Sequence, residues 1–417
     1  MTRPLRIAVV AACPFPERRG TPVRIQRIAE GIQRRGHQVH VVTYPYGSGE
    51  LDEPVTLHRV RPAGTSYRAA PGPSISKLLV IDPLLVLMLR QVLREQQIDV
   101  IHAHHYEGLL AGAAARTGTG IPLIYDAHTL LESELPSYGR AIPGGAKRAF
   151  GALLDRKLPP LADHVISVTD RIRDTLLART RFRPEQVSSI SNGVECDLFD
   201  RHVAAERDPA RPPIIVFTGN LAAYQGVDLL LKAFQTVRAS RPDVRLRIVT
   251  QSGFAEYEPA ARLLGIRDGI DLVDTGFENV PALLAESDIA VNPRPGCDGI
   301  PLKLLNYMAA ARPVVSFEGS APGVEHGQTG WLVPRGDASA FALGILTLLA
   351  APDQAREIGR QARRYVEEHH SWDAVAERTE RVYRELAGHR PTPRGTARII
   401  TEMPGASSES ALGAGAG

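Results

Sequence analysis

The stretch LRIAVVAACPFPERRGTPVRIQRIAEGIQRRGHQVHVVTY, residues 5–44, decides the fold class. Its continuous apolar run at 5–12 predicts a buried strand, and a loop with Pro and Gly follows that run. Apolar residues then recur at helical spacing up to Gly36, which predicts an amphipathic helix ended by that glycine. A second β-branched run at 37–44 completes a strand, helix, strand unit, the building block of parallel sheets.

This alternation continues along the first half of the chain and restarts in the second half. The further apolar runs that predict strands are IDVIHAH, PLIYDAH, HVISVTD, IIVFTG, RLRIVT, IDLVDTG, DIAVNPR and PVVSFEG. A polar, Pro-rich stretch at 202–213 separates the two series and resembles a linker. We therefore expect an α/β protein with two doubly wound, Rossmann-like domains whose parallel sheets face an interdomain cleft.

Composition excludes several classes of function. A formal net charge of +3 over 417 residues argues against a nucleic-acid partner. The three cysteines are far apart and form no CxxC pair, so we expect neither a disulfide framework nor a thiolate zinc site, and a reducing cytoplasm. The most hydrophobic window, 77–93, contains Asp82 and Pro83 and predicts a largely buried helix, with peripheral membrane contact as the alternative.

In the first half, two strand-to-helix loops carry candidate site residues. Gly20 and Thr21 precede a helix whose N-terminus favours an anion, although a glycine there is also a common turn device. His128 follows a strand two residues after Asp126, a carboxylate that could orient its ring; the alternative is a structural histidine. The run HAHH at 102–105 invites a metal site, but its histidines alternate along a strand and no second cluster follows, so no metal is expected.

In the second half, the loop FTGNLAAYQG contains Gly219, which permits close backbone approach, and the neutral donors Asn220 and Gln225. Taken alone, Asn220 would be a turn or capping residue. Arg294 leaves the strand that ends in NPR toward the expected cleft.

The stretch DGIPLKLLN at 298–306 opens a helix after a Gly-Ile-Pro turn. Lys303 and Asn306 share one face of that helix, while Leu304 belongs to the apolar face. The polar face could contact a ligand or simply water.

Several of these pieces together resemble one family, the retaining glycosyltransferases of the family 4 type, which have the GT-B architecture. The matching segments are SNGVECDLF, TGNLAAYQGVDLLLKAF, PLKLLNYMAAARPVVSF, HGQTGWLVPRGD and SWDAVAERTERVYREL, with looser matches in GTPVRIQRIAEGIQRRGHQVHVVT, DVIHAHHYEG and YDAH. Their order and spacing cover nearly the whole second half.

The resemblance implies that a nucleotide-diphosphate sugar binds mainly to the second domain and an acceptor mainly to the first. It implies transfer with retention of the anomeric configuration, with no catalytic metal and no cofactor besides the donor. In the proposed front-face route the leaving phosphate oxygen takes the acceptor proton, so no paired-carboxylate motif is needed.

The chain departs from the family pattern at the charged positions. Asn220 and Gln225 stand where the family usually has Arg and Lys, and Asp298 and Asn306 stand for two glutamates eight residues apart. A charge-assisted hydrogen bond is roughly twice as strong as a neutral one, so the phosphate contacts should be weaker unless other cations serve. Our candidates for these cations are Arg294 and Lys303.

The resemblance, together with the hypothesis that Arg294 and Lys303 compensate for the missing cations, assigns a role to each candidate. His128 and Asp298 are the predicted catalytic residues. The predicted donor-binding residues are Gly20, Thr21, Gly219, Asn220, Gln225, Arg294, Gly299, Ile300, Pro301, Lys303, Leu304 and Asn306.

The expected domains are 1–203 on the acceptor side and 204–370 on the donor side. A helix at 371–389 returns toward the first domain, as in the family, and 390–417 is expected to be a disordered tail. A role in cell-envelope polysaccharide, exopolysaccharide or glycolipid synthesis, in the cytoplasm or at the inner face of the membrane, is typical of such relatives. The acceptor could be a glycan, a lipid-linked sugar or a small molecule, and the oligomeric state is left open.

Two other functions remain open. One is a non-catalytic relative that binds sugar nucleotides or glycans after losing the charged site. The other is an epimerase or hydrolase on the same architecture.

Overall fold

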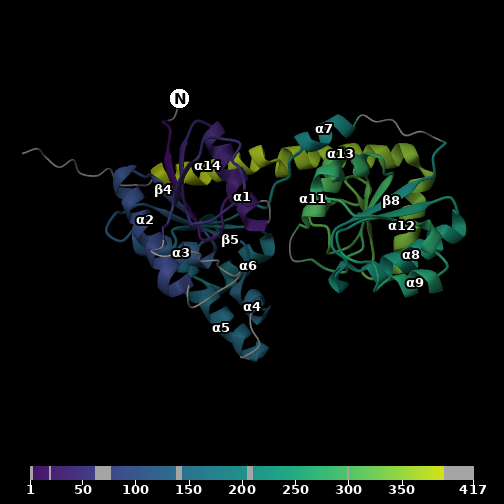
Figure 1. Ribbon diagram of the computed structural model, residues 1–417, viewed down its shortest axis with the longest axis horizontal. Helices are drawn as coiled ribbons and strands as arrows, with labels where there is room; N and C mark the ends of the chain where they lie inside the picture. The colour runs from purple at the N-terminus through teal and green to yellow at the C-terminus, as the bar shows by residue number, and fades with distance from the viewer. Residues whose placement is uncertain are drawn as a thin grey trace, which may run out of the picture.

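The computed structural model describes residues 3–17, 20–61, 77–137, 143–203, 210–297 and 300–388. Two parallel sheets with flanking helices lie in separate halves of the molecule (Figure 1). The expected α/β architecture with two Rossmann-like domains is therefore confirmed. The predicted tail at 390–417 lies outside the described residues.

The first sheet has seven strands in the order β3-β2-β1-β4-β5-β6-β7. Its strands are β1 (Arg6–Ala11), β2 (Gln38–Thr43), β3 (Thr56–Arg59), β4 (Val100–His104), β5 (Leu123–Ala127), β6 (His164–Ser167) and β7 (Val187–Ser189). Its helices are α1 (Gly20–Arg34), α2 (Asp82–Glu95), α3 (His105–Ala115), α4 (Leu131–Glu134), α5 (Gly144–Lys157) and α6 (Asp170–Arg179). The run at 5–12 forms β1, which pairs in parallel with β2 and β4 and is buried after its first residue. Polar residues do not alternate with apolar ones along β1 because helices cover both faces of the sheet.

The second sheet has six strands in the order β10-β9-β8-β11-β12-β13. Its strands are β8 (Ile214–Thr218), β9 (Arg245–Val249), β10 (Ile270–Val273), β11 (Ile289–Asn292), β12 (Val314–Phe317) and β13 (Trp331–Val333). The helices of this half and of the C-terminus are α7 (Asp197–Val203), α8 (Val227–Ser240), α9 (Glu258–Leu263), α10 (Val280–Ala285), α11 (Leu302–Ala309), α12 (Ala338–Ala350), α13 (Pro352–His370) and α14 (Trp372–Gly388).

The chain crosses between the domains twice, and the two crossings are hydrogen-bonded. The N–H of Val194 donates to the carbonyl of His370 at 2.7 Å. Phe199 on α7 is buried in the same core as Met308 of the second domain, whereas Tyr383 on α14 is buried in the core of the first. Helices α13 and α14 therefore follow one another across both domains (Figure 1).

The apolar window at 77–93 differs from the single, largely buried helix that we expected. A short π-helical turn at Lys77–Ile81 precedes α2, and Pro83 lies in the first turn of that helix. One face is buried, but Leu87 on the other is 60% exposed. Within the described ranges no single helix is long and apolar enough to cross a membrane; α12 and α13 reach that length only as a pair bent by 103°.

Candidate functional site

The loop after β8 approaches the loop after β11 most closely at Gly226. Gly219 and Gly226 have φ angles of 126° and 71°, in the region that favours glycine. A Cβ on Gly226 would lie 2.2 Å from the carbonyl oxygen of Pro293. Since β8 and β11 are parallel neighbours, both loops leave the same edge of the sheet, the edge at which open α/β sheets bind ligands.

Four polar side chains form a continuous network at this edge. Lys303 Nζ donates to Gln225 Oε1 at 2.6 Å, and Gln225 Nε2 donates to Asn220 Oδ1 at 3.4 Å. Asn220 Nδ2 in turn donates to the hydroxyl of Tyr224 at 3.1 Å. The structure thus brings together three predicted donor residues and adds Tyr224, which no sequence pattern singled out.

Two cations flank this network. Lys303 Nζ lies 4.1 Å from the centroid of the Phe217 ring. The guanidinium carbon of Arg294 lies 4.9 Å from the centroid of the Tyr224 ring. Burial, followed by the positive charge of Arg294, lowers the pKa of Lys303 to about 7. An anion bound here would offset both effects and favour the charged amine.

The predicted residues of α11 point in different directions. Pro301 precedes the helix, and Lys303 and Asn306 are half-buried on its polar face. Leu304 is fully buried in the core, and its N–H donates to the carbonyl of Pro301 at 2.9 Å. Leu304, predicted to contact the donor, therefore packs inside the domain.

The start of that stretch is only partly described. Asp298, a predicted catalytic residue, and Gly299 lie outside the described residues. Ile300 is half-buried and packs against the core of the second domain.

In the first domain, the predicted residues meet at the carboxyl edge of β4 and β5. Gly20, with a φ of 54°, and Thr21 form the start of α1. Thr21 Oγ1 lies 2.9 Å from His105 Nε2, and the His105 ring stacks on that of His128 with centroids 4.5 Å apart. His105 itself has a φ of 62°, which is uncommon for a residue with a side chain and is often found at functional sites.

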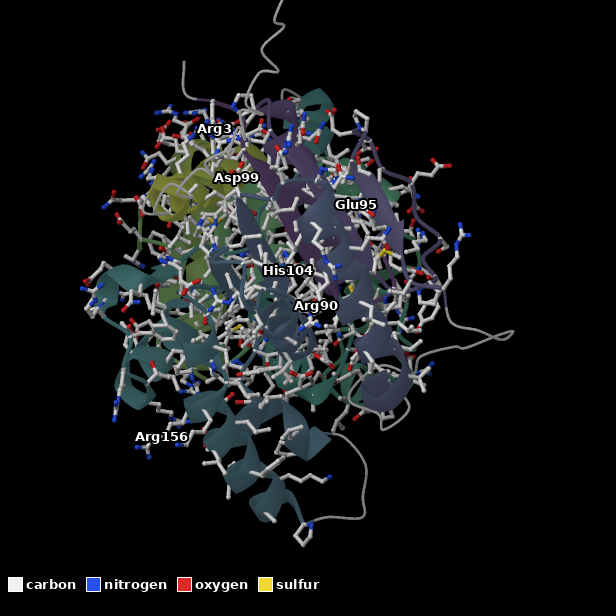
Figure 2. All side chains as sticks on the ribbon, turned by 90° about the vertical axis from the view of Figure 1, so that its left-hand side faces the viewer. Arg3, Arg90, Glu95, Asp99, His104 and Arg156 are labelled. Atoms are coloured by element: carbon white, nitrogen blue, oxygen red, sulfur yellow. The ribbon has the colours of Figure 1, made fainter. Side chains whose placement is uncertain are left out.

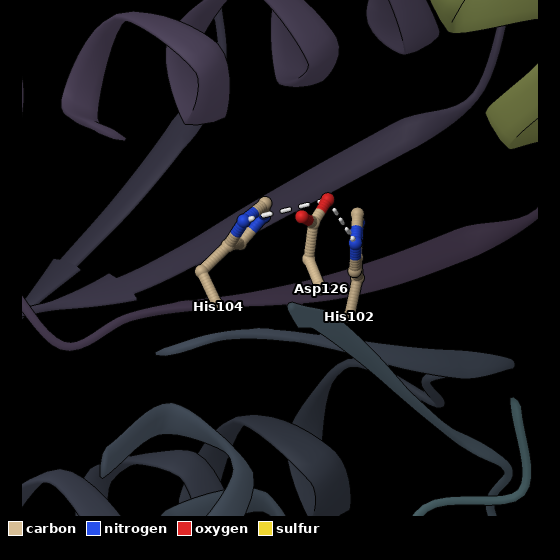
Figure 3. A group of neighbouring side chains, drawn as sticks. All are labelled: His102, His104 and Asp126. Atoms are coloured by element: carbon tan, nitrogen blue, oxygen red, sulfur yellow. Dashed lines mark ion pairs between the residues drawn. The ribbon is translucent and has the colours of Figure 1, made fainter. Parts of the chain in front are cut away.

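Behind His128 lies a buried carboxylate with several partners. Arg24 Nη2 is 3.0 Å from Asp126 Oδ2, and both side chains are almost completely buried. His102 Nε2 and His128 Nε2 each lie 3.3 Å from an oxygen of Asp126, and His104 Nδ1 lies at 3.8 Å. Figure 3 shows Asp126 between His102 and His104, which extend from the adjacent strand.

The electrostatics of this cluster keep the carboxylate ionised. Burial alone would raise the pKa of Asp126, but Arg24, foremost, and the neighbouring histidines hold it well below its usual value. Burial also lowers the pKa values of His104 and His128 well below that of a free imidazole. At neutral pH His128 is therefore an uncharged ring beside a charged carboxylate.

The histidines at 102 and 104 are the residues for which a metal site was considered but not expected. His102 and His104, two residues apart, lie on the same face of β4, and their nitrogens lie within 4.8 Å of one another and of an oxygen of Asp126. A metal ion could be held by such a set. Arg24 already supplies the positive charge beside Asp126, however, so the cluster fits an internal ion pair better.

Arg24 also reaches the crossing between the domains. Its Nη1 donates to the carbonyl of Ser191 and its Nη2 to that of Ile190, each at 2.9 Å. The predicted His128 is thus connected through Asp126 and Arg24 to the start of this crossing. Among the described residues, no hydrogen bond or ion pair joins this group directly to the network around Lys303.

Replacement of Gly226 by Ala tests the loop geometry. The new Cβ would be both in a strained backbone region and in contact with the carbonyl of Pro293, so we expect a loss of about 1–3 kcal/mol in unfolding free energy. Gly253→Ala is the matched control, because its φ is ordinary and no atom lies within 4 Å of the added methyl group. Chemical denaturation measures both; equal stabilities of the two variants would contradict the close approach.

Comparisons with known proteins agree with this geometry. The model of Glycosyltransferase Family 4 matches residues 18–198, and that of Glycosyl transferases group 1 matches 212–351. The D-inositol 3-phosphate glycosyltransferase 2 of Catenulispora acidiphila is 28% identical over 303 residues, 68% of this chain and 70% of the relative.

Two solved structures show the same fold. The sucrose-phosphate synthase of Thermosynechococcus elongatus superposes with a TM-score of 0.69 at 19% identity, over 92% of this chain and 99% of its own. The Anabaena protein HepE, in complex with UDP-glucose, superposes with a TM-score of 0.64 at 17% identity. The match covers 91% of this chain and 100% of HepE.

Each half of the chain thus matches a different family model. The arrangement of the loops at the two sheet edges is consistent with both matches. The chain therefore belongs to the family 4 type glycosyltransferases, with a C-terminal domain of glycosyl transferases group 1.

Proposed function

We propose that this glycosyltransferase moves a sugar from a nucleotide-diphosphate sugar to an acceptor hydroxyl with retention of the anomeric configuration. The observation that carries the proposal is the hydrogen bond from Lys303 to Gln225. By its resemblance to the family, Gln225 stands at a position that usually holds a lysine, and Lys303 places its ammonium 2.6 Å from the end of that side chain. A positive charge therefore reaches nearly the same place from α11.

The proposed chemistry assigns each group a role. The bond between the anomeric carbon and the diphosphate breaks, a bond to the acceptor oxygen forms on the same face, and the acceptor proton passes to the leaving phosphate oxygen. Lys303 and Arg294 stabilise the charge that develops on the diphosphate, so the step needs neither a metal nor a cofactor besides the donor. Gly20 and Thr21 approach the diphosphate from the first domain.

His128 acts on the acceptor side in this proposal. As a neutral ring oriented by Asp126, it can hydrogen-bond a sugar hydroxyl without adding charge. Asp298 stays a prediction for contact with the donor sugar, and Asn306 for contact with the ribose. We place the reaction in the cytoplasm, in synthesis of envelope polysaccharide, exopolysaccharide or glycolipid.

The test is turnover of a donor panel. Because HepE was solved with UDP-glucose, UDP-sugars come first, followed by GDP- and ADP-sugars. Free nucleotide is measured with and without sugar, lipid-linked and phosphorylated acceptors, and the anomeric configuration of the product is read by NMR. Donor binding without turnover across all acceptors would favour the non-catalytic relative; an inverted product would overturn the retaining mechanism.

The pKa of Lys303 predicts how donor affinity depends on pH. Because its pKa is lowered to about 7, the ammonium is charged below that pH and loses its proton above it. A diphosphate binds the charged form, so UDP affinity should fall by up to about tenfold per pH unit above 7, until the higher pKa of the complex is reached. Isothermal titration from neutral to alkaline pH measures this slope.

Lys303→Arg is the control for this pH dependence, since arginine stays protonated over the whole range. Its UDP affinity should be nearly independent of alkaline pH. The same slope in both proteins would assign the dependence to another group.

A further inference from the structure

Helix α5 packs one face against the first domain and exposes large apolar side chains on another. The inner face packs on α4 so closely that a Cβ on Gly151 would lie 2.5 Å from the backbone nitrogen of Glu132. Asp155 is buried on this same face, and Leu154 is half-buried. Packing of the first domain therefore accounts for the inner face alone.

The outer face exposes large hydrophobic side chains. Phe150 is 56% and Leu153 50% exposed, and they follow one another at helical spacing. Figure 1 shows α5 projecting from the body of the first domain. Nothing in the fold of the described residues explains why this helix carries an aromatic and a branched apolar side chain there.

The exposed charged side chains of α5 itself are all basic. Arg148, Arg156 and Lys157 are exposed, and no ion pair is found for them within the described part of the chain. Arg156 extends outward from the projecting helix (Figure 2). The only acidic residue of α5, Asp155, is buried. An exposed Phe and Leu flanked by Lys and Arg are typical of a helix that lies on a membrane surface.

The inner face links this helix to the acceptor side of the site. Asp155 Oδ1 accepts a hydrogen bond from the N–H of Leu131 at 2.9 Å, and its Oδ2 from that of Glu132 at 3.0 Å. Those residues immediately follow the loop that carries His128. The hydroxyl of Tyr106, on α3, donates to the same carboxylate. The exposed face of α5 therefore lies on the element that anchors the His128 loop.

We infer that α5 docks the first domain on a membrane surface that contains anionic lipids. Phe150 and Leu153 enter the boundary between headgroups and acyl chains, while Arg156 and Lys157, three and four positions after Leu153, meet the negative headgroups. A second copy of the chain fits this face less well, because a two-fold contact would bring the same positive charges together. The inference deepens the proposed function. The role of the contact, to present a lipid-linked acceptor beside His128, rests on that function.

Sedimentation with vesicles tests the contact directly. The full-length protein should bind vesicles of equal parts phosphatidylglycerol and phosphatidylcholine, and bind phosphatidylcholine alone at least about tenfold less. The double variant Phe150→Ser/Leu153→Ser should lose about tenfold or more of the binding to the anionic vesicles. Leu263→Ser is the matched control, since Leu263 is 89% exposed on α9 of the other domain, and its binding should be unchanged.

Further measurements separate the possible outcomes. Thermal unfolding checks that the double variant is folded, and nucleotide release with a soluble acceptor should be unchanged, so a failure of docking is distinct from a failure of the proposed reaction. Absence of wild-type binding to the anionic vesicles, or equal binding by wild type and the double variant, would overturn the inference. So would a dimer in light scattering that the double variant abolishes, because a second copy would then cover this face.

Discussion

Arg24→Met is expected to lower the unfolding free energy by about 3–5 kcal/mol, the range found when one partner of a buried ion pair is removed. The substitution leaves the fully buried carboxylate of Asp126 without its strongest partner. It also removes the donors to the carbonyls of Ile190 and Ser191 at the domain crossing. Urea denaturation followed by circular dichroism measures the loss, provided that one cooperative transition is seen.

Arg34→Met is the matched control on the same helix. Arg34 forms its ion pairs with Glu53 and Asp373 at the surface, so the expected loss is at most about 1 kcal/mol. Combining Arg24→Met with Asp126→Asn should cost less than the sum of the two single changes, because the unpaired charge is then absent. Additive losses, or a loss for Arg24→Met no larger than for Arg34→Met, would show that the pair does not stabilise the domain.

The sequence predicted the two sheets because buried parallel strands have a simple pattern. The run that forms β1 is apolar without interruption, and such runs occur where helices cover both faces of a sheet. The donor-side loop could also be selected, since glycines and short polar residues directly follow the end of β8. Both inferences need only local information and the rule that ligands bind at the carboxyl edge of a parallel sheet.

What the sequence missed depends on contacts between distant residues. Arg24 occurs in an amphipathic helix, where a cation is usually solvated, and its partner Asp126 is 102 positions away. His105 has an ordinary sequence context, and only its left-handed backbone turns the ring toward Thr21 and His128. Leu304 was selected through its position in a family motif, although its apolar spacing already placed it on the core face.

Lys303→Met is expected to lower kcat/KM for the nucleotide sugar by about 10²–10³-fold, the range seen when one preorganised donor to a developing negative charge is removed. Methionine keeps an unbranched stem that can pack on Phe217, so the ammonium is what the variant chiefly loses. The loop at 219–226, which contains Asn220 and Gln225, has no charged side chain that could substitute for it. Steady-state release of nucleotide, with the preferred donor and acceptor, measures the effect.

Lys232→Met makes the same chemical change at an exposed position of α8 in the same domain. Its kcat/KM should stay within about twofold of wild type, because a surface charge outside the site is screened by solvent and salt. Arg294→Ala should lower kcat/KM too, and by more in wild type than in the Lys303→Met background, because both cations act on one diphosphate. If Lys303→Met and Arg294→Ala each leave turnover unchanged, the diphosphate is not held by these residues. Charge must then come from elsewhere, because a loop with only Asn220 and Gln225 cannot offset the charge of the leaving group.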